Sequence, residues 1–237
     1  LPIFINAVDS NTFLVSCMYV NNETGAVMPV KRIFTQIKKL YPDCITHCDA
    51  VQAFMKLPIK TADLGADLIT VSGHKVHAPK GVGAMYIRKG IRIAPRMLGG
   101  GQEKGLRSGT ESVPLISAFG AAVRVQLPTI ATAYSNAEEL CGRLRKKLST
   151  LDYITINSNA EDQCPYILNF SVNGIRSEIM LHFLESKNIF VSRYAGIISI
   201  LSFLRCIIIF IIQHFSADFY SLSKIYPLHI STWALDR

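Results

Sequence analysis

The chain has 237 residues, of which 49% are hydrophobic and 18% are charged, and its formal net charge is +8. This composition suits one large domain plus part of a second, and it excludes an intrinsically disordered chain. The positive charges are scattered and no nucleic-acid-binding motif accompanies them, so we expect no nucleic-acid partner.

Apolar runs alternate with helical patterns in the first half of the chain. Residues 14–20 have strand character, residues 21–25 form a turn, and a helix begins after Pro29 with Ile33, Ile37 and Leu40 on one face. Further strands are expected at 45–49, up to Ser72 and at 83–87, followed by a helix at 113–125. This alternation predicts an α/β fold with a mainly parallel sheet and flanking helices, in which ligands bind at the carboxyl ends of strands.

A domain boundary is expected near Pro128. Residues 1–127 then form a large cofactor-binding domain, and residues 128–192 form part of a smaller α+β domain. The smaller domain is expected to contain helices at 135–148 and 178–187 and strands at 153–157 and 167–172.

Residues 193–237 form an apolar tail of atypical composition, with eight isoleucines between residues 197 and 212. A membrane anchor at 197–212 is one interpretation, but Arg205 in the middle of so short a run opposes insertion by ~2.5–3.5 kcal/mol. We favour a reading-frame slip or gene decay, which would also produce such a tail.

The first residues and the cysteines of the chain indicate in which cellular compartment the protein is expected. No basic region precedes residues 1–7, so they do not match a signal peptide. The six cysteines contain no CxxC pair and no zinc-ligand spacing, which predicts no metal site and inert core thiols at Cys17 and Cys48. A reduced, cytoplasmic setting is expected.

Ser72-Gly73-His74-Lys75 follows an apolar strand and carries the strongest chemical signal. A lysine at the end of a buried strand can form a Schiff base with an aldehyde, and the neighbouring serine and histidine can bind a phosphate. Asp49 suits a protonated pyridine nitrogen, and Gln52 suits the neighbouring ring oxygen. Together these residues predict a site for pyridoxal 5'-phosphate (PLP).

Each residue also has a structural interpretation. Asp49 can cap the turn after its strand, Gln52 can be a solvated turn amide, and Ser72 with His74 can cap a strand end. The cofactor interpretation rests on the ordered combination and not on any single position.

The order of the motifs between about residues 10 and 192 resembles the cysteine desulfurase family, PLP enzymes of the class V aminotransferase group. The matching segments are Asn21-Asn22-Glu23-Thr24-Gly25, His47-Cys48-Asp49-Ala50-Val51-Gln52, Ser72-Gly73-His74-Lys75, Pro79-Lys80-Gly81-Val82-Gly83-Ala84-Met85-Tyr86-Ile87, Gly99-Gly100-Gly101-Gln102-Glu103 and Arg107-Ser108-Gly109-Thr110-Glu111.

The resemblance implies a homodimeric enzyme of PLP fold-type I that converts L-cysteine to L-alanine. Sulfur would pass through an enzyme persulfide to an acceptor or scaffold protein, as in iron–sulfur cluster assembly. Lys75 would carry PLP and Asp49 would support its ring nitrogen. Asn22 would lie near the phenolic oxygen, and Thr110 would reach the phosphate of the partner subunit. Their structural alternatives are a simple turn residue for Asn22 and an N-cap for Thr110.

Two departures from the family pattern limit this expectation. A family segment with a phosphate-binding turn and a ring-stacking histidine has no counterpart ahead of Leu1. Arg193-Tyr194-Ala195 stands where the family has a loop with the catalytic cysteine, and Cys206 lies among isoleucines and is not assigned as nucleophile. We therefore expect no physiological desulfurase activity from this chain alone. Selenocysteine lyase, another class V enzyme and a non-catalytic decayed or membrane-tethered remnant remain alternatives.

Overall fold

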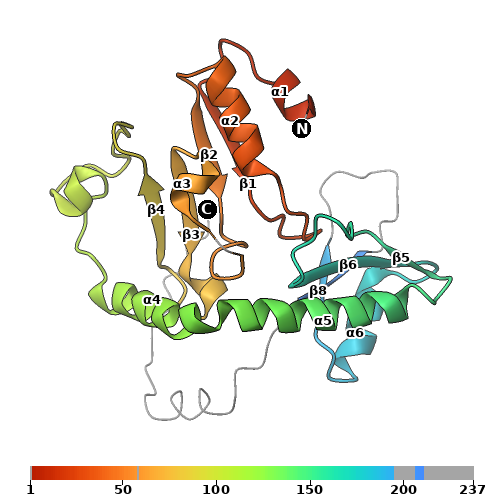
Figure 1. The fold of residues 1–237 in the computed structure, drawn as a ribbon. Coiled ribbons are helices and arrows are strands. Elements are labelled where there is room, and N and C mark those ends of the chain that lie inside the picture. The colour runs from red at the N-terminus through yellow and green to blue at the C-terminus, as the bar shows by residue number, and fades with distance from the viewer. Residues whose placement is uncertain (1, 58, 195–205, 211–237) are drawn as a thin grey trace.

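The computed structural model describes residues 2–57, 59–194 and 206–210, and these form two four-stranded sheets joined by a long helical segment (Figure 1). The larger sheet has the order β1-β2-β3-β4, with strands at Leu14–Met18, Ile45–Asp49, Leu68–Ser72 and Gly83–Ile87. Strands β1, β2 and β3 run parallel, and β4 is antiparallel to β3. The predicted α/β class with a mainly parallel sheet is confirmed.

Two crossovers bring three strand ends to one edge of this sheet. Helix α2 (Val30–Leu40) connects β1 to β2, and helix α3 (Thr61–Leu64) connects β2 to β3. In register, Asp49 pairs with Met18 on one side and with Thr70 on the other. Because parallel strands point the same way, the turns after β1, β2 and β3 leave from the same edge.

Helix α2 covers one face of the sheet with an apolar stripe. Ile33, Phe34 and Ile37 are fully buried and belong to the same cluster as Cys17 and Cys48 of the strands. Burial of each large apolar side chain contributes about 1.5–3 kcal/mol. Helix α1 (Pro2–Asn6) adds Phe4 and Ile5 at the border of this cluster.

Leu40, which was expected on the same helix face as Ile33 and Ile37, is 53% exposed. Leu40 is the last residue of α2, and the stripe that faces the sheet is already formed by the preceding apolar residues of the helix. The helical period shows which residues share a face of α2, but it does not show how far along the helix that face is covered by the sheet.

The cysteines of the larger sheet are core residues, as predicted. Cys17 and Cys48 are buried and unpaired, and so are Cys44, Cys141 and Cys164. Burial raises the pKa of Cys48 to about 12, and the neighbouring Cys17 and Asp49 act in the same direction. Since the thiolate is the reactive form of cysteine, Cys48 is inert at neutral pH.

The second sheet is antiparallel and has the order β5-β6-β8-β7, with strands at Ile154–Ile156, Ile167–Val172, Cys206–Phe210 and Ser192–Tyr194. Helix α6 (Ser177–Glu185) packs on it, and Met180 contacts the cluster around Phe170 and Val172. The expected strands and helix of the smaller unit are confirmed to within a few residues.

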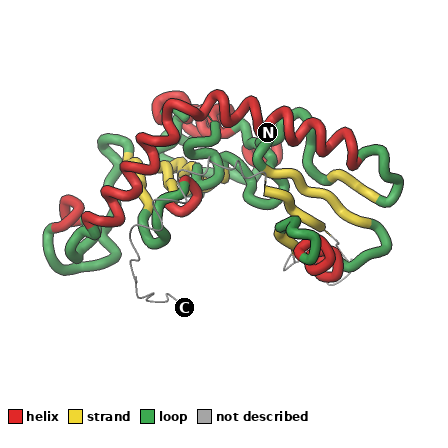
Figure 2. Tube along the Cα trace, turned by 90° about the horizontal axis from the view of Figure 1, so that it is seen from below, coloured by secondary structure: helices red, strands yellow, loops and turns green. Residues whose placement is uncertain are grey.

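One continuous helical segment links the two sheets (Figures 1 and 2). It consists of α4 (Val113–Gln126), the 3₁₀ turn η3 (Leu127–Thr129) and α5 (Ile130–Leu148). Pro128, where a boundary was expected, lies inside η3, where its fixed φ is tolerated. The division into residues 1–127, 128–192 and 193–237 stays a prediction.

By length and composition, the stretch Val113–Leu148 would qualify as a membrane span. In Figure 2 the same stretch runs alongside both sheets. Helices of soluble proteins meet the same criterion, so this observation assigns no membrane role.

Part of the atypical tail belongs to the second sheet. Residues 206–210 form β8, which pairs with β6 on one side and β7 on the other. A run of β-branched residues favours such a strand. The membrane anchor was considered for residues 197–212. Apart from 206–210, the residues of this segment lie outside the part of the chain that the structure describes.

Candidate active site

The predicted site residues lie on the three turns that leave the carboxyl edge of the larger sheet. Asn22 follows β1, Asp49 ends β2 and Gln52 follows it, and Ser72 ends β3 and is followed by His74 and Lys75. The register between β2 and its neighbours places these turns next to one another. Six of the seven predicted residues therefore meet at one edge, where α/β sheets bind ligands.

The first turn is built by Asn21. Its Oδ1 accepts hydrogen bonds from the backbone N–H groups of Glu23 (3.0 Å) and Thr24 (2.9 Å). This Asx turn leaves the neighbouring Asn22 side chain exposed at the sheet edge. Asn22 is itself a turn residue, as its structural alternative expected, while Asn21 supplies the side-chain hydrogen bonds of the turn.

The same turn is attached to the segment that connects β5 to β6 in the second sheet. The backbone N–H of Cys164 donates to the carbonyl of Gly25 (2.8 Å), and that of Val27 donates to Asp162 (2.8 Å). The Ser158 hydroxyl donates to the carbonyl of Thr24 (2.6 Å). Residues from both sheets therefore define the position of the first turn.

Gly25 is required at this junction by its conformation and by its surroundings. Its φ is +73°, and an added Cβ would lie 2.8 Å from the Ile167 carbonyl oxygen. We expect Gly25→Ala to lower the free energy of unfolding by about 2–4 kcal/mol, combining left-handed strain with overpacking. Urea unfolding followed by circular dichroism measures this loss.

Gly105→Ala is the matched control, because Gly105 has φ +80° and no atom within 4 Å of an added Cβ. It reports the backbone cost alone, about 1–2 kcal/mol. Equal losses in the two variants would contradict the close contact at Gly25.

The second turn carries Asp49 and Gln52. Asp49 is half-buried, and its Oδ1 accepts a hydrogen bond from the Val51 backbone N–H (3.0 Å). This local bond matches the capping interpretation but uses only one of the two carboxylate oxygens. Gln52 is 3% exposed, so the interpretation of a solvated amide was wrong. The Lys56 Nζ donates to its Oε1 over 3.0 Å.

The third turn is the 3₁₀ turn η1 (Gly73–Val76), which follows β3 directly. Ser72 Oγ and His74 Nδ1 are 2.7 Å apart, and Lys75 is half-buried. Burial lowers the pKa of His74, and the charges of Lys75 and Lys80 lower it further. A neutral imidazole keeps one N–H donor for an anion.

Helix α4 contacts two of these turns, those after β2 and β3. Gln126 Nε2 donates to the backbone carbonyl of Val76 (2.6 Å), at the end of η1. The rings of Phe54 and Phe119 meet edge to face with centroids 6.1 Å apart. The turns after β2 and β3 are thus held by the same helix.

Thr110 does not join the other six residues within one chain. It is exposed on the segment that connects β4 to α4, which projects away from both sheets and contains the 3₁₀ turn η2 (Gln102–Gly105) (Figure 1). Its alternative as helix cap was wrong, because Ser112 is the N-cap residue of α4. The assignment of Thr110 to a partner subunit stays a prediction.

Sequence reasoning assigned no role to two side chains next to the site, His47 and Lys56. His47 Nδ1 lies 2.7 Å from Ser16 Oγ, and its Nε2 lies 3.1 Å from Thr70 Oγ1, so it bridges β1, β2 and β3. Burial lowers the pKa of His47, while the charge of Asp49 opposes this change. His47 and Asp49 are two residues apart in β2, so their side chains lie on the same face of the sheet. This spacing was already visible in the sequence.

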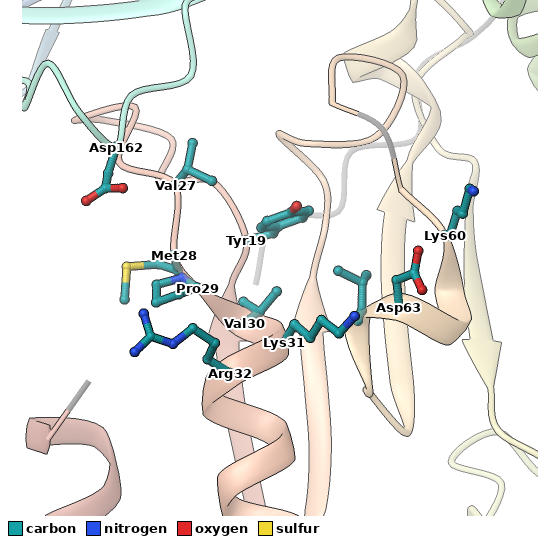
Figure 3. Close-up of a pocket in the computed structure, with 11 residues that line it drawn as sticks. Tyr19, Val27, Met28, Pro29, Val30, Lys31, Arg32, Lys60, Asp63 and Asp162 are labelled. Atoms are coloured by element: carbon teal, nitrogen blue, oxygen red, sulfur yellow. The ribbon is translucent and has the colours of Figure 1, made fainter.

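A cavity of about 500 Å³ lies elsewhere, between the beginning of α2 and α3 (Figure 3). It is lined by Tyr19, Arg32, Lys60 and Asp63 among others, and by none of the seven predicted site residues. Among the described residues, no cluster of three or more histidine, cysteine, aspartate or glutamate side chains could hold a metal ion.

Relatives of known name resemble this chain over most of its length. A cysteine desulfurase of Trichormus azollae is 40% identical over 176 residues, which cover 74% of this chain and 44% of the relative. Cysteine desulfurase IscS of Escherichia coli is 38% identical over 177 residues, covering 74% and 43%. The mitochondrial cysteine desulfurase of Saccharomyces cerevisiae is 36% identical over 180 residues, covering 74% and 35%. The chain thus spans less than half the length of these curated relatives.

Solved structures agree with this similarity. A NifS-like protein superposes with a TM-score of 0.83 at 35% identity, covering 94% of this chain and 63% of that protein. A NifS-like protein of Rickettsia africae gives a TM-score of 0.81 at 29% identity, covering 96% and 65%. The family described as aminotransferase class-V, whose members depend on PLP, matches residues 2–200. The chain belongs to the class-V aminotransferase family.

Proposed function

We propose that this chain forms the cofactor-binding part of a PLP-dependent cysteine desulfurase, which converts L-cysteine to L-alanine and passes sulfur on through an enzyme persulfide. One observation carries the proposal: Lys75, Asp49 and Gln52 lie on adjacent turns at one sheet edge. An amine, a carboxylate and a buried amide are the groups that PLP chemistry requires. The similarity to curated cysteine desulfurases supports the same function.

The groups at this edge fit PLP. Asp49 keeps one carboxylate oxygen beyond its local bond to Val51, and this oxygen suits a protonated ring nitrogen. Ser72 and His74 offer a hydroxyl and an imidazole, which suit a phosphate. Lys75 is half-buried in η1, directly after β3, where its amine can form a Schiff base with the aldehyde of PLP.

When bound here, PLP would supply an electron sink for bond cleavage at the substrate α-carbon. Lys75 Nζ would hold the cofactor and then move the proton at that carbon. Asp49 would keep a proton on the ring nitrogen. Gln52 and Asn22 would bind the phenolic oxygen, and Ser72 and His74 would bind the phosphate.

The proposal includes partners and a compartment. L-cysteine would be the substrate, and a sulfur-acceptor or scaffold protein would take the sulfur. Thr110 would reach the phosphate site of a second copy in a homodimer, which suits its place on a projecting segment. The buried, unpaired cysteines suit a reducing compartment such as the cytoplasm.

Replacement of Asp49 by asparagine tests the electronic role of this carboxylate. This chain matches 43% of the Escherichia coli relative, so we specify a hybrid in which residues 2–192 are flanked by the terminal segments of that relative. Asp49→Asn should still bind PLP but release alanine and sulfide about 10- to 100-fold more slowly, because one charge-assisted bond is lost in the transition state.

Asp43→Asn is the matched control, since Asp43 is an exposed carboxylate ahead of the same strand. Near-normal turnover by a folded Asp49→Asn hybrid would refute the role of Asp49. Selenide release in preference to sulfide would instead indicate a selenocysteine lyase. A hybrid that binds PLP without turning over either substrate would indicate a non-catalytic remnant.

A further inference from the structure

Lys56 lies close to the candidate site but belongs to none of the roles above. It ends the compact turn after β2, four residues beyond Gln52, and its side chain is half-buried. Its Nζ donates to Gln52 Oε1 over 3.0 Å and lies 5.9 Å from the centroid of the Tyr166 ring. Lys56 therefore contacts both a predicted cofactor ligand and the segment that leads into β6.

The surroundings of Lys56 suit a positive charge in spite of its burial. Burial lowers the pKa of Lys56, Cys164 opposes this effect, and Lys75 adds to it. The amide oxygen of Gln52 and the face of an aromatic ring are both favourable partners for an ammonium group. Burial raises the pKa of Tyr166 to about 12, so this partner is a neutral ring at physiological pH.

The contact determines how the Gln52 amide is oriented. An ammonium group has three donors and no acceptor, so only the amide oxygen can face it. Both N–H donors of Gln52 Nε2 are then left for other acceptors. Gln52 has no other side-chain hydrogen-bond partner among the described residues, so these donors remain available to a ligand. An electron-rich oxygen at the site, such as the phenolic oxygen of PLP, would accept such a bond.

We propose that Lys56 is a positioning residue, which holds Gln52 so that its amide N–H donors face the cofactor. The inference rests on the proposed function, because it requires PLP at this edge. Without Lys56 the amide is free to rotate, and its oxygen would then oppose the phenolic oxygen. Through Tyr166, the same lysine connects this orientation to the segment before β6.

The test is a double-mutant cycle on PLP binding by the full 237-residue chain, measured by absorbance titration. Lys56→Met removes the ammonium but keeps the apolar stem, and should weaken PLP binding about 10- to 100-fold, the loss expected for one charge-assisted bond. In a Gln52→Ala background the same substitution should change binding less than about 2-fold, because there is no amide left to orient. Lys56→Arg should restore binding to within about 2-fold, since guanidinium is also a donor-only cation.

Lys60→Met is the matched control, because Lys60 is an exposed lysine near the same turn. Thermal unfolding of each variant separates a general loss of stability from an effect on the site. Equal effects of Lys56→Met with and without Gln52, or no rescue by arginine, would overturn the inference while leaving the proposed function intact. Absence of PLP binding by the unsubstituted chain would overturn both.

Discussion

Lys75→Ala should abolish covalent retention of PLP and reduce desulfurase turnover of the hybrid protein by about 10³-fold or more, as expected when a covalent catalyst is removed. Lys75 follows the last residue of β3 within η1, and the turns of Asp49 and Gln52 lie beside it. Lys56 is a second lysine near this edge, but its Nζ donates a hydrogen bond to Gln52 Oε1. Borohydride reduction followed by peptide mapping measures which lysine holds the cofactor.

Lys80→Ala is the control for Lys75, because Lys80 is an exposed lysine five positions further along the chain. It should leave both colour and turnover unchanged to within about 2-fold, as is usual for surface substitutions. A pyridoxyl label on Lys80, or on Lys56, would show that Lys75 is not the cofactor lysine.

Asp67→Ala should lower the free energy of unfolding by about 1–3 kcal/mol, because it leaves the buried Thr46 amide without its acceptor and removes both ion pairs of this carboxylate. Asp67 is 0% exposed, immediately before β3. Its Oδ2 lies 2.6 Å from Lys38 Nζ of α2 and accepts a hydrogen bond from the Thr46 backbone N–H (2.9 Å), and its Oδ1 pairs with Arg88. One carboxylate therefore joins α2, β2 and the end of β4.

Glu139→Ala provides the contrast between a buried and an exposed ion pair. Glu139 lies 3.8 Å from Arg143 on the surface of α5, and both side chains are largely exposed. Its loss should cost less than about 0.5 kcal/mol. Urea unfolding followed by circular dichroism measures both variants, and similar losses would contradict the buried network at Asp67.

The network also predicts how stability depends on pH. Burial alone would raise the pKa of Asp67, but the hydrogen bond from Lys38, the Thr46 amide and the charges of Lys38 and Arg88 outweigh it and lower this pKa from its ordinary value of 3.8. A carboxyl group whose pKa is lower in the folded state than in the unfolded state stabilises the protein at pH values above its unfolded-state pKa. This contribution should be lost as the pH falls through the folded pKa, below about pH 4. The difference in unfolding free energy between the native chain and Asp67→Ala should then shrink in acid.

Much of the candidate site could be predicted because it depends on local order along the chain. Asp49 ends one strand and Lys75 follows another, and in a parallel sheet residues in these positions share one edge. The burial of Gln52 could not be predicted, since it depends on the packing of a compact turn against the segment before β6. Lys56 was missed for the same reason: its partner Tyr166 is 110 positions away in the sequence.

The sequence by itself determined the α/β class, the positions of most helices and strands and the family, because hydrophobic periods and motif order are local properties. Only the tertiary structure decided that Pro128 lies inside a continuous helical segment, that Leu40 is exposed and that residues 206–210 pair between β6 and β7. These features depend on which surfaces meet, and contacts between distant residues leave no periodic signal in the chain. The buried pairing of Asp67 with Lys38 and Arg88 is of the same kind, since a charge becomes a core residue only when the fold brings its partners to it.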